Sequence, residues 1–465
     1  MVKEGKCMYN RRMKTQNLTA EEQYDKMVNT SVSRLITGLA IPTVISMLVT
    51  SIYNMADTFF VSHINTQASA AVGIVFPIMS IIQAVGFTLG MGAGSLVSIR
   101  LGQKRNEEAS IIASTALFTA FGVGALITIF GNIFTRQFLS LVGASESVLP
   151  YAQQYGRFIF WGAPLMCASF VLNNVLRSEG KAFFSMIALT SGGLINIALD
   201  PLFIYGLKMG ISGAALATII SQTISFSILL SWFLRGKAVC HMSIKLYRFT
   251  VDVLGKTVAT GVPSLARQGL ASLATILLNT TAGAYGDSAV AAMSITTKIV
   301  MFVASIMIGI GQGFSPVSGY NYGAKRYDRV KKAYRFLVAS GFGIMACFSI
   351  VIFIFAPQIM RGFISDESAV AVGLVALRWQ IAFIPFHPLI VGTNMLMQST
   401  RHIKAATFLS MNRQGVYFIP AILILPRIFG LFGVEISQAA ADILSAITAI
   451  PYLIAMFRKL DRLEA

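Results

Sequence analysis

The sequence predicts an all-α polytopic membrane protein, with twelve transmembrane helices in two six-helix bundles that are related by an internal repeat. Three observations carry this prediction: an unusually apolar composition, long apolar runs along the whole chain, and a set of residues that recurs after 221 positions. Helices are the expected elements, because only helices and closed barrels satisfy their backbone hydrogen bonds within a bilayer.

The composition excludes an ordinary soluble protein. Of the 465 residues, 55% are hydrophobic and only 12% are charged, and the mean hydropathy is +0.70. Soluble domains carry about 25% charged residues, and a large core does not explain so wide a deficit. The chain is therefore expected to place much of its surface in lipid.

Apolar runs of about 20 residues, long enough to cross ~30 Å of hydrocarbon as helices, recur throughout the chain. The uniform runs cover 70–99, 111–134, 184–206, 211–234, 288–313, 335–356 and 434–457, and more polar ones cover 38–62, 151–176, 253–282, 378–398 and 406–428. The first 34 residues are polar and charged, so we expect no signal peptide.

The two halves of the chain repeat one another at a constant offset. Pro42 falls on Pro263, and the segment GQKR at 102–105 falls on GAKR at 323–326. Because six spans, an even number, separate the repeats, both halves have the same orientation, as in transporters with parallel repeats. Small residues at four-residue steps, as in GFTLGMGAG (86–94), indicate close packing between helices. Further matched pairs are Gly90 with Gly311, Arg157 with Arg378, Asn173 with Asn394 and Ser178 with Ser399.

Basic residues gather on one side of the predicted topology. The N-terminal tail, every second loop and the C-terminus hold most of the 37 Lys and Arg, whereas the alternate loops hold only Arg136, Lys208, Arg361 and Arg427. By the positive-inside rule, both termini are cytoplasmic. The net charge of +18 is thus a topology signal, not a nucleic-acid surface, and we expect a multi-pass protein of the inner (cytoplasmic) membrane.

The repeat and the charge pattern together divide the chain into five segments. Transporters built from such repeats bind substrate between two lobes and alternate access to it. The predicted segments are a cytoplasmic tail (1–34), an N-terminal lobe with helices 1–6 (35–234), a basic interlobe linker (235–250), a C-terminal lobe with helices 7–12 (251–457) and a cytoplasmic tail (458–465).

Two carboxylates lie well inside apolar spans, and both belong to the first half. Asp57 lies in YNMADTFFVSH and Asp200 in INIALDPLFIYG, where Asn196 precedes it by four residues and so shares its helix face. A charge at mid-bilayer costs about 2.5–3.5 kcal/mol or more. Neighbouring buried acids therefore indicate a site that holds and releases H⁺ or a small cation such as Na⁺; the alternative is simple hydrogen bonding between helices. In the same half, the fourth span contains Asn173, and the sixth span carries a stripe at four-residue spacing made of Ala214, Thr218 and Gln222.

The embedded ionisable groups of the second half are mainly cations, namely Arg267, Lys298 and Arg413. Glu435 and Asp442, in the last span, are candidate partners for them. Two interpretations stay open at this point. The cations either form buried ion pairs that fix helix register, or line a cavity that attracts anions.

Several stretches resemble a known family. YNMADTFFVSH, RLGQKR, VLNNVLRSEGKA, NIALDPLFIYG and GISGAALATIISQ resemble the first repeat of the multidrug and toxic compound extrusion (MATE) transporters. PVSGYNYGAKR resembles the matching signature of their second repeat, and the resemblance covers nearly the whole chain. The absence of acids from the seventh, eighth and tenth spans resembles the DinF-type bacterial branch.

The resemblance implies two six-helix bundles that form a V and export of drugs driven by H⁺ or Na⁺. It places the family's cation site on Asp57, Asn196 and Asp200, with Asn173, Ala214 and Thr218 around it. No cofactor and no other metal are expected beyond the coupling H⁺ or Na⁺. The expected partners are amphipathic, often cationic small molecules and membrane lipids, and the chain is expected to be a monomer.

Two other functions are alternatives to drug export. A flippase for a lipid-linked saccharide or another anionic amphiphile would use Arg267, Lys298 and Arg413 to bind its headgroup, provided that these side chains face the central cavity. A membrane-embedded enzyme finds little support, because the sequence contains no HExxH, GxSxG or Walker motif.

Overall fold

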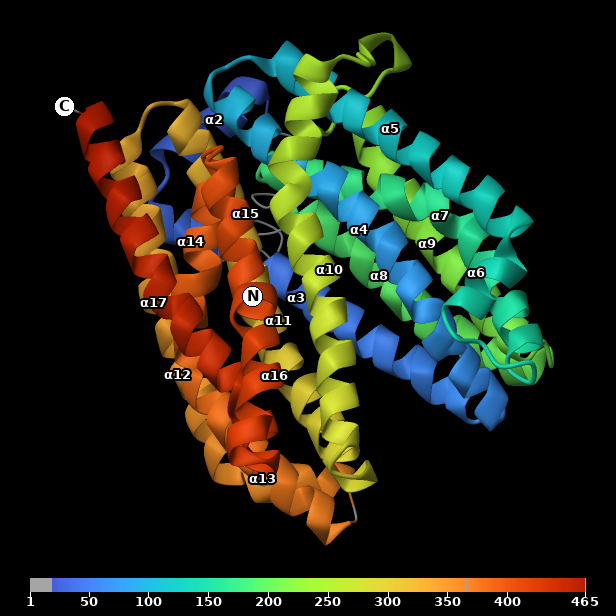
Figure 1. The fold of residues 1–465 in the computed structure, drawn as a ribbon. Coiled ribbons are helices and arrows are strands. Elements are labelled where there is room, and N and C mark those ends of the chain that lie inside the picture. The colour runs from blue at the N-terminus through green and yellow to red at the C-terminus, as the bar shows by residue number, and fades with distance from the viewer. Residues whose placement is uncertain (1–18, 365, 465) are drawn as a thin grey trace, which may run out of the picture.

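The computed structural model describes residues 19–364 and 366–464, and the helices of this part form two bundles (Figure 1). The first bundle holds the blue to green helices and the second holds the yellow to red ones. The elements of the first are α3 (Val32–Ser62), α4 (Thr66–Gly102), α5 (Asn106–Ile133), the short α6 (Thr135–Leu141), α7 (Leu149–Ser178), α8 (Ala182–Pro201) with the π-helical turn η1 (Leu202–Gly206), and α9 (Ile211–Leu234).

The second bundle repeats this order with more interruptions. Two of its spans are broken by a short turn, and each break lies beside a proline or a polar residue. The elements are η3 (Val251–Gly255), α10 (Lys256–Gly283), α11 (Asp287–Gly323), α12 (Tyr327–Phe363), α13 (Glu367–Phe383) with η4 (Ile384–Phe386) and α14 (His387–Ser399), α15 (Ile403–Met411) with η5 (Asn412–Val416) and α16 (Phe418–Phe429), and α17 (Leu431–Glu464). Outside the bundles lie α2 (Ala20–Asn29) and η2 (Ile244–Leu246).

The predicted helical membrane fold is confirmed. Each predicted apolar run forms a helix or a pair of consecutive helices, and eleven helical spans of the described chain are long and apolar enough to cross a membrane. The remaining run forms α10, whose 28 residues include Lys256, Arg267 and Gln268. These polar side chains lower its hydropathy, although its length suffices.

The internal repeat extends to the conformation of the loops. Lys104 and Lys325, which are 221 positions apart, both have positive φ angles, of 60° and 59°. Gly210 and Gly430, in a later loop, have φ angles of 58° and 61°. Positive φ is uncommon for residues other than glycine, so the agreement at the two lysines reflects one loop structure used twice.

The two bundles touch through backbone at small residues. A Cβ atom on Gly92 of α4 would overlap the carbonyl oxygen of Thr257 in α10, and one on Gly261 of α10 would overlap that of Thr88 in α4. Glycine permits such an approach because it has no side chain. The prediction that the repeated glycines serve close packing is confirmed, and the contact they make joins the two bundles.

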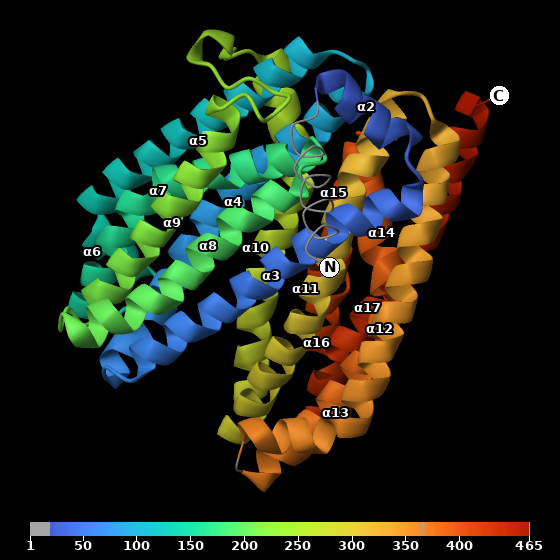
Figure 2. The same ribbon diagram turned by 180° about the vertical axis from the view of Figure 1, so that it is seen from behind.

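The bundles converge at one end of the molecule and diverge towards the other. Figures 1 and 2 show α2, the segment 235–250 and the end of α17 at the converging end, and α6 and α13 at the opposite end. The converging end holds most of the basic loops, and we call it the basic end; we call the opposite one the splayed end. The splayed arrangement gives the V shape that the family resemblance implies.

Helix α2 makes contact with both bundles at the basic end. It begins with a capping box, in which Thr19 and Glu22 bond each other's backbone N–H. The Gln23 Nε2 atom donates a 2.7 Å hydrogen bond to the carbonyl oxygen of Glu179, just after α7. The Asn321 Nδ2 atom of α11 donates one of 3.2 Å to the carbonyl oxygen of Met27. The helix thus bridges the bundles where they already touch.

Candidate coupling-ion site

The two membrane acids of the first bundle lie close to one buried tyrosine near the splayed end. Asp57 lies near the end of α3, Asp200 near the end of α8, and Tyr155 near the start of α7. The Tyr155 hydroxyl donates a 3.5 Å hydrogen bond to Oδ2 of Asp57. Tyr155 is fully buried, and both carboxylates and Thr218 are its neighbours. Three helices therefore bring their polar groups to one place.

Three oxygen atoms of this cluster have no hydrogen-bond donor among the described residues. They are Oδ1 of Asp57, Oδ2 of Asp200 and Oδ1 of Asn196. Asn196 uses its amide nitrogen for a 3.4 Å hydrogen bond to the other oxygen of Asp200. Asp200 and Asn196 are 0% and 3% exposed, so neither can turn to bulk water. Buried acceptors without donors are costly, and carboxylate and amide oxygens are the ligands that hard cations take.

The predicted stripe on α9 borders the same cluster. The Thr218 hydroxyl donates a 3.1 Å hydrogen bond to the carbonyl oxygen of Ala214, one turn earlier. Its lone pairs are then left for a donor or a cation, since a hydroxyl both donates and accepts. Thr218 is 6% exposed and lies beside Tyr155. Asp57, Asn196, Asp200, Ala214 and Thr218 are thus brought together as the sequence predicted.

Asn173 is the exception, and its assignment to this cluster is corrected. It lies 18 residues after Tyr155 on the same helix, a distance of about 27 Å at 1.5 Å per residue. Its Nδ2 atom donates a 2.7 Å hydrogen bond to the hydroxyl of Ser185. The repeat-related Asn394 donates to Ser410 over the same 2.7 Å in the second bundle. Asn173 therefore joins α7 to α8 near the basic end.

Tyr155 is the member of the cluster that sequence reasoning missed. It is one of 14 tyrosines, and neither its spacing nor its neighbours in QQYGRF distinguish it. Its position becomes visible only when α7 is packed against α3. Asn54, three residues before Asp57, is exposed and does not join the cluster.

In the second bundle, one predicted cation is paired with one predicted acid. The Arg413 Nε atom lies 2.7 Å from Oδ1 of Asp442, and His387 Nε2 lies 3.1 Å from the other carboxylate oxygen. Asp442 is 1% exposed and His387 is 2% exposed. Gln438 also donates to Asp442, over 2.9 Å. Arg413 therefore takes the ion-pair role that the sequence left open, and His387 joins it at the start of α14.

The remaining candidates of this bundle have different environments. Arg267 lines a cavity of about 80 Å³, together with Arg413 and His387. Lys298 is exposed, and Glu435 is buried with 5% of its surface exposed. Within the described residues, neither Lys298 nor Glu435 takes part in an ion pair.

The family comparison agrees with the repeat that the sequence and backbone display. The MatE family model matches the chain twice, over residues 42–202 and 263–423. The chain belongs to the MatE family. The two matches start 221 residues apart, which is the offset of the repeat, and one match lies in each bundle. The predicted relationship to MATE transporters is therefore confirmed.

Curated MatE relatives are similar over almost their whole length. The Multidrug export protein MepA of Staphylococcus haemolyticus is 26% identical over 431 residues, which cover 92% of this chain and 95% of that protein. The protein of the same name from Staphylococcus saprophyticus is 25% identical over 447 residues, covering 96% and 99%.

Solved structures described as MATE or MOP superfamily transporters share the fold. A structure described as MATE in complex with MaL6 has a TM-score of 0.89 and 28% identity, covering 94% of this chain and 99% of the other. An outward-facing conformation of a multidrug resistance MATE family transporter matches equally well, with 27% identity and coverage of 94% and 98%. A transporter from Pyrococcus furiosus, described as having a binding pocket of reverse polarity, has a TM-score of 0.88 and 27% identity, covering 95% and 98%.

Proposed function

We propose that this protein is a secondary active multidrug exporter, which moves amphipathic organic compounds across the membrane in exchange for H⁺ or Na⁺. The observation that carries the proposal is the set of donor-free oxygens on Asp57, Asn196 and Asp200, buried in the first bundle of a MatE family member. In a membrane, such a set is a site for a proton or a small cation.

Ion and substrate transport are coupled because both ligands bind a protein that exchanges between two arrangements of its lobes. The acid cluster lies near the splayed end, whereas the backbone contacts between the bundles lie nearer the basic end. An ion that binds one arrangement more tightly shifts the population towards it. Charge on Asp57 and Asp200 changes when the ion binds or leaves, and this change biases the packing of α3, α8 and α9 around them.

The orientation and location follow from the charge pattern. We place the basic end in the cytoplasm by the positive-inside rule, so that the splayed end opens outwards. The protein then lies in the cytoplasmic membrane, as a monomer. The names of the MepA relatives support the choice of multidrug substrates.

The flippase alternative loses its main support at Arg413. A cation that recognises an anionic headgroup must be free to meet it, and Arg413 is paired with Asp442. Arg267 lines a cavity of only about 80 Å³, well below the ~300–1,000 Å³ of pockets for organic ligands. We therefore keep export of amphipathic compounds as the proposed function.

Efflux from proteoliposomes tests the proposal directly. The purified protein is reconstituted, and transport of the cationic dye ethidium is followed under an imposed pH gradient and then under an imposed Na⁺ gradient. One of the two ion gradients should drive the dye against the dye's own concentration gradient. Collapse of that ion gradient by an ionophore should stop the transport. Transport that needs neither gradient would contradict the exchange mechanism.

A further inference from the structure

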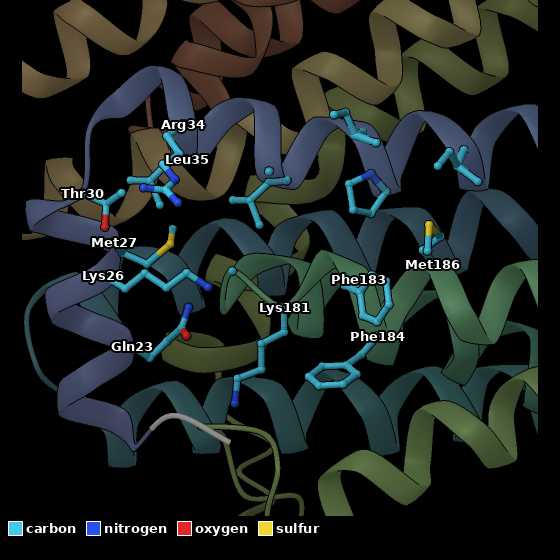
Figure 3. Close-up of a pocket in the computed structure, with 16 residues that line it drawn as sticks. Gln23, Lys26, Met27, Thr30, Arg34, Leu35, Lys181, Phe183, Phe184 and Met186 are labelled. Atoms are coloured by element: carbon cyan, nitrogen blue, oxygen red, sulfur yellow. The ribbon is translucent and has the colours of Figure 1, made fainter. Parts of the chain in front are cut away.

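A groove at the basic end lies between α2, the start of α3 and the start of α8 (Figure 3). Its volume is about 650 Å³, within the ~300–1,000 Å³ of pockets that hold organic ligands. It shares no lining residue with the acid cluster or with the Arg413–Asp442 pair. The groove is thus a separate place where a ligand can bind.

Three cations from three segments line this groove. Lys26 belongs to α2, Arg34 to α3, and Lys181 precedes α8, whereas none of the sixteen lining residues is Asp or Glu. Figure 3 shows Lys26 and Arg34 at the end beside α2, with Lys181 between them and the aromatic end. This part of the groove has the charge that suits an anion.

The charge of Lys181 acts on Lys26, while Lys181 itself also lies in the field of the buried carboxylate of Glu179. Burial lowers the pKa of the Lys26 ammonium, and the charge of Lys181 lowers it further. Lys181 is 7% exposed and donates one hydrogen bond, to the carbonyl oxygen of Lys237. An ammonium group has three donors, so hydrogens remain for a ligand. An anion between the two lysines would offset their repulsion.

The rest of the groove is apolar and continues onto the outer surface of the helices. Ile41 and Ile45 of α3 are 55% and 39% exposed, and Phe183 of α8 is 44% exposed. On helices that span a membrane, such side chains contact lipid tails. Between Arg34 and Ile45 the helix rises by about 16 Å. The groove therefore joins a cationic end to a hydrocarbon-facing end along α3.

We propose that this groove binds one anionic phospholipid of the cytoplasmic leaflet, with its phosphate between Lys26, Arg34 and Lys181. An acyl chain then lies along Ile41 and Phe183. The leaflet rests on the orientation proposed above. Clusters of basic residues between membrane helices on the cytoplasmic side recognise anionic headgroups in this way, and ammonium and guanidinium groups form charge-assisted hydrogen bonds to phosphate.

Other occupants suit the groove less well. A cationic amphipathic compound has the same sign of charge as the three lining cations and would be repelled. The N-terminal residues 1–18 contain five Lys or Arg and one Glu, so their net charge also has the wrong sign. Only an anion with an apolar chain matches both the cationic end and the hydrocarbon-facing end of the groove.

Trp232 provides a local reporter for the lipid. Its ring centroid lies 4.1 Å from that of Phe184, which lines the groove. The chain has three tryptophans, so Trp161→Phe with Trp379→Phe leaves Trp232 as the only one. In bilayers of phosphatidylcholine with added phosphatidylglycerol, either lipid can carry brominated chains that quench nearby tryptophan. Brominated phosphatidylglycerol should reach half-maximal quenching at a mole fraction about fivefold lower than brominated phosphatidylcholine.

Two sets of variants decide whether the groove is responsible. Lys26→Gln, Arg34→Gln and Lys181→Gln together should abolish the preference for phosphatidylglycerol. Gly38→Phe should reduce quenching by both lipids without changing charge, because Gly38 lines the groove and no atom lies within 4 Å of a Cβ placed there. This second variant decides the matter if the triple variant does not fold.

A charge-matched control replaces Lys332, Arg458 and Arg462 with Gln. These residues are also at the basic end but do not line the groove. The control should keep the preference. Equal quenching by the two lipids in the parent protein, or an equal loss in the control, would overturn the proposal. A preference that emerges only after deletion of residues 1–18 would also overturn it, because that segment would then be the natural occupant.

Discussion

The Tyr155 hydroxyl donates a 3.5 Å hydrogen bond to Oδ2 of Asp57, and it thereby joins α7 to α3 at the buried acid cluster. Oδ1 of the same carboxylate has no donor among the described residues. One oxygen is thus held in place while the other is left for an ion. Tyr155 is buried on all sides, so it fixes the carboxylate without adding charge.

Tyr155→Phe should therefore shift the ion dependence of export while the fold is kept. If the ion is H⁺ it should bind more tightly, because the hydroxyl donates to the ionised carboxylate and stabilises it. Loss of one hydrogen bond to a carboxylate costs about 1.5–3 kcal/mol, equivalent to about a 10- to 150-fold change in affinity. The concentration of H⁺ or Na⁺ that gives half-maximal export should shift by up to this factor. Tyr285→Phe is the control, since that hydroxyl donates a 3.2 Å bond to a backbone oxygen in the second bundle. An unchanged ion dependence in Tyr155→Phe would remove the tyrosine from the mechanism.

Asp57→Asn and Asp200→Asn should each abolish gradient-driven export. Both substitutions keep the side-chain shape and remove the charge that couples the ion to the lobes. Dye binding should persist, as measured by fluorescence anisotropy on the purified protein. Glu435→Gln, which removes a buried acid of the second bundle, is the control and should retain most of the export. An Asp57→Asn variant that pumps at the parent rate would refute the proposed site.

Arg413→Gln should destabilise the protein whatever the substrate. It leaves the carboxylate of Asp442 in the bundle interior without its 2.7 Å partner, and breaking a buried pair costs about 3–5 kcal/mol. Arg361→Gln is the matched control, because Arg361 pairs with Glu367 at an exposed position over 3.2 Å, where a pair contributes about 0–1 kcal/mol. Thermal unfolding in detergent should show a clearly lower melting temperature for Arg413→Gln and a nearly unchanged one for Arg361→Gln. Normal stability together with altered substrate range would favour a cavity role for Arg413.

Gly92→Ala should shift the balance between lobe arrangements. A Cβ at this position would overlap the carbonyl oxygen of Thr257 in the other bundle, so the contact at the basic end must loosen. Spin labels on α5 and α12, measured by pulsed electron resonance, should report a broader distance distribution at that end. Gly122→Ala, where no atom lies within 4 Å of the Cβ, should leave the distribution unchanged. The same distribution in both variants would argue against an interlobe role for Gly92.

Cysteine labelling tests the orientation. Gln103→Cys, at the exposed basic end, should react only with a reagent applied from the cytoplasm, and Ser145→Cys, at the opposite end, only from outside. The background must lack all four native cysteines, among them Cys7 and the exposed Cys347. Labelling of the pair with the sides exchanged would invert the proposed topology.

Much of the fold could be predicted because each level of the sequence carries its own signal. Hydropathy located the spans, and the offset of 221 residues fixed how the halves relate. The four-residue spacing of Asn196 and Asp200 placed them on one face, which the structure retains. These signals are local or periodic, so they can be recognised in the sequence without knowing how the helices pack.

The errors and omissions concern residues whose role depends on their depth in the membrane and on how the helices pack. The family resemblance places Asn173 beside the acids, although it lies near the basic end of α7 and they lie near the splayed end. Counting residues along the span would have separated them. The choice of Asp442, and not Glu435, as the partner of Arg413 depends on how α17 is rotated against η5. Tyr155 offered no pattern at all, since its role comes from a neighbouring helix.

The fold is duplicated, but within residues 19–364 and 366–464 the acid cluster, where two carboxylates meet, occurs in one copy. If the exchanged ions are carried at Asp57 and Asp200, a turnover can use no more than two of them. Each charge that moves down a potential of 100 mV releases about 2.3 kcal/mol. From this potential alone, with no difference in ion concentration, two charges then sustain a concentration ratio of about 2,000 for a neutral compound. The number of buried carboxylates thus sets a thermodynamic ceiling on how far the cell can be cleared of a compound, however tightly the transporter binds it.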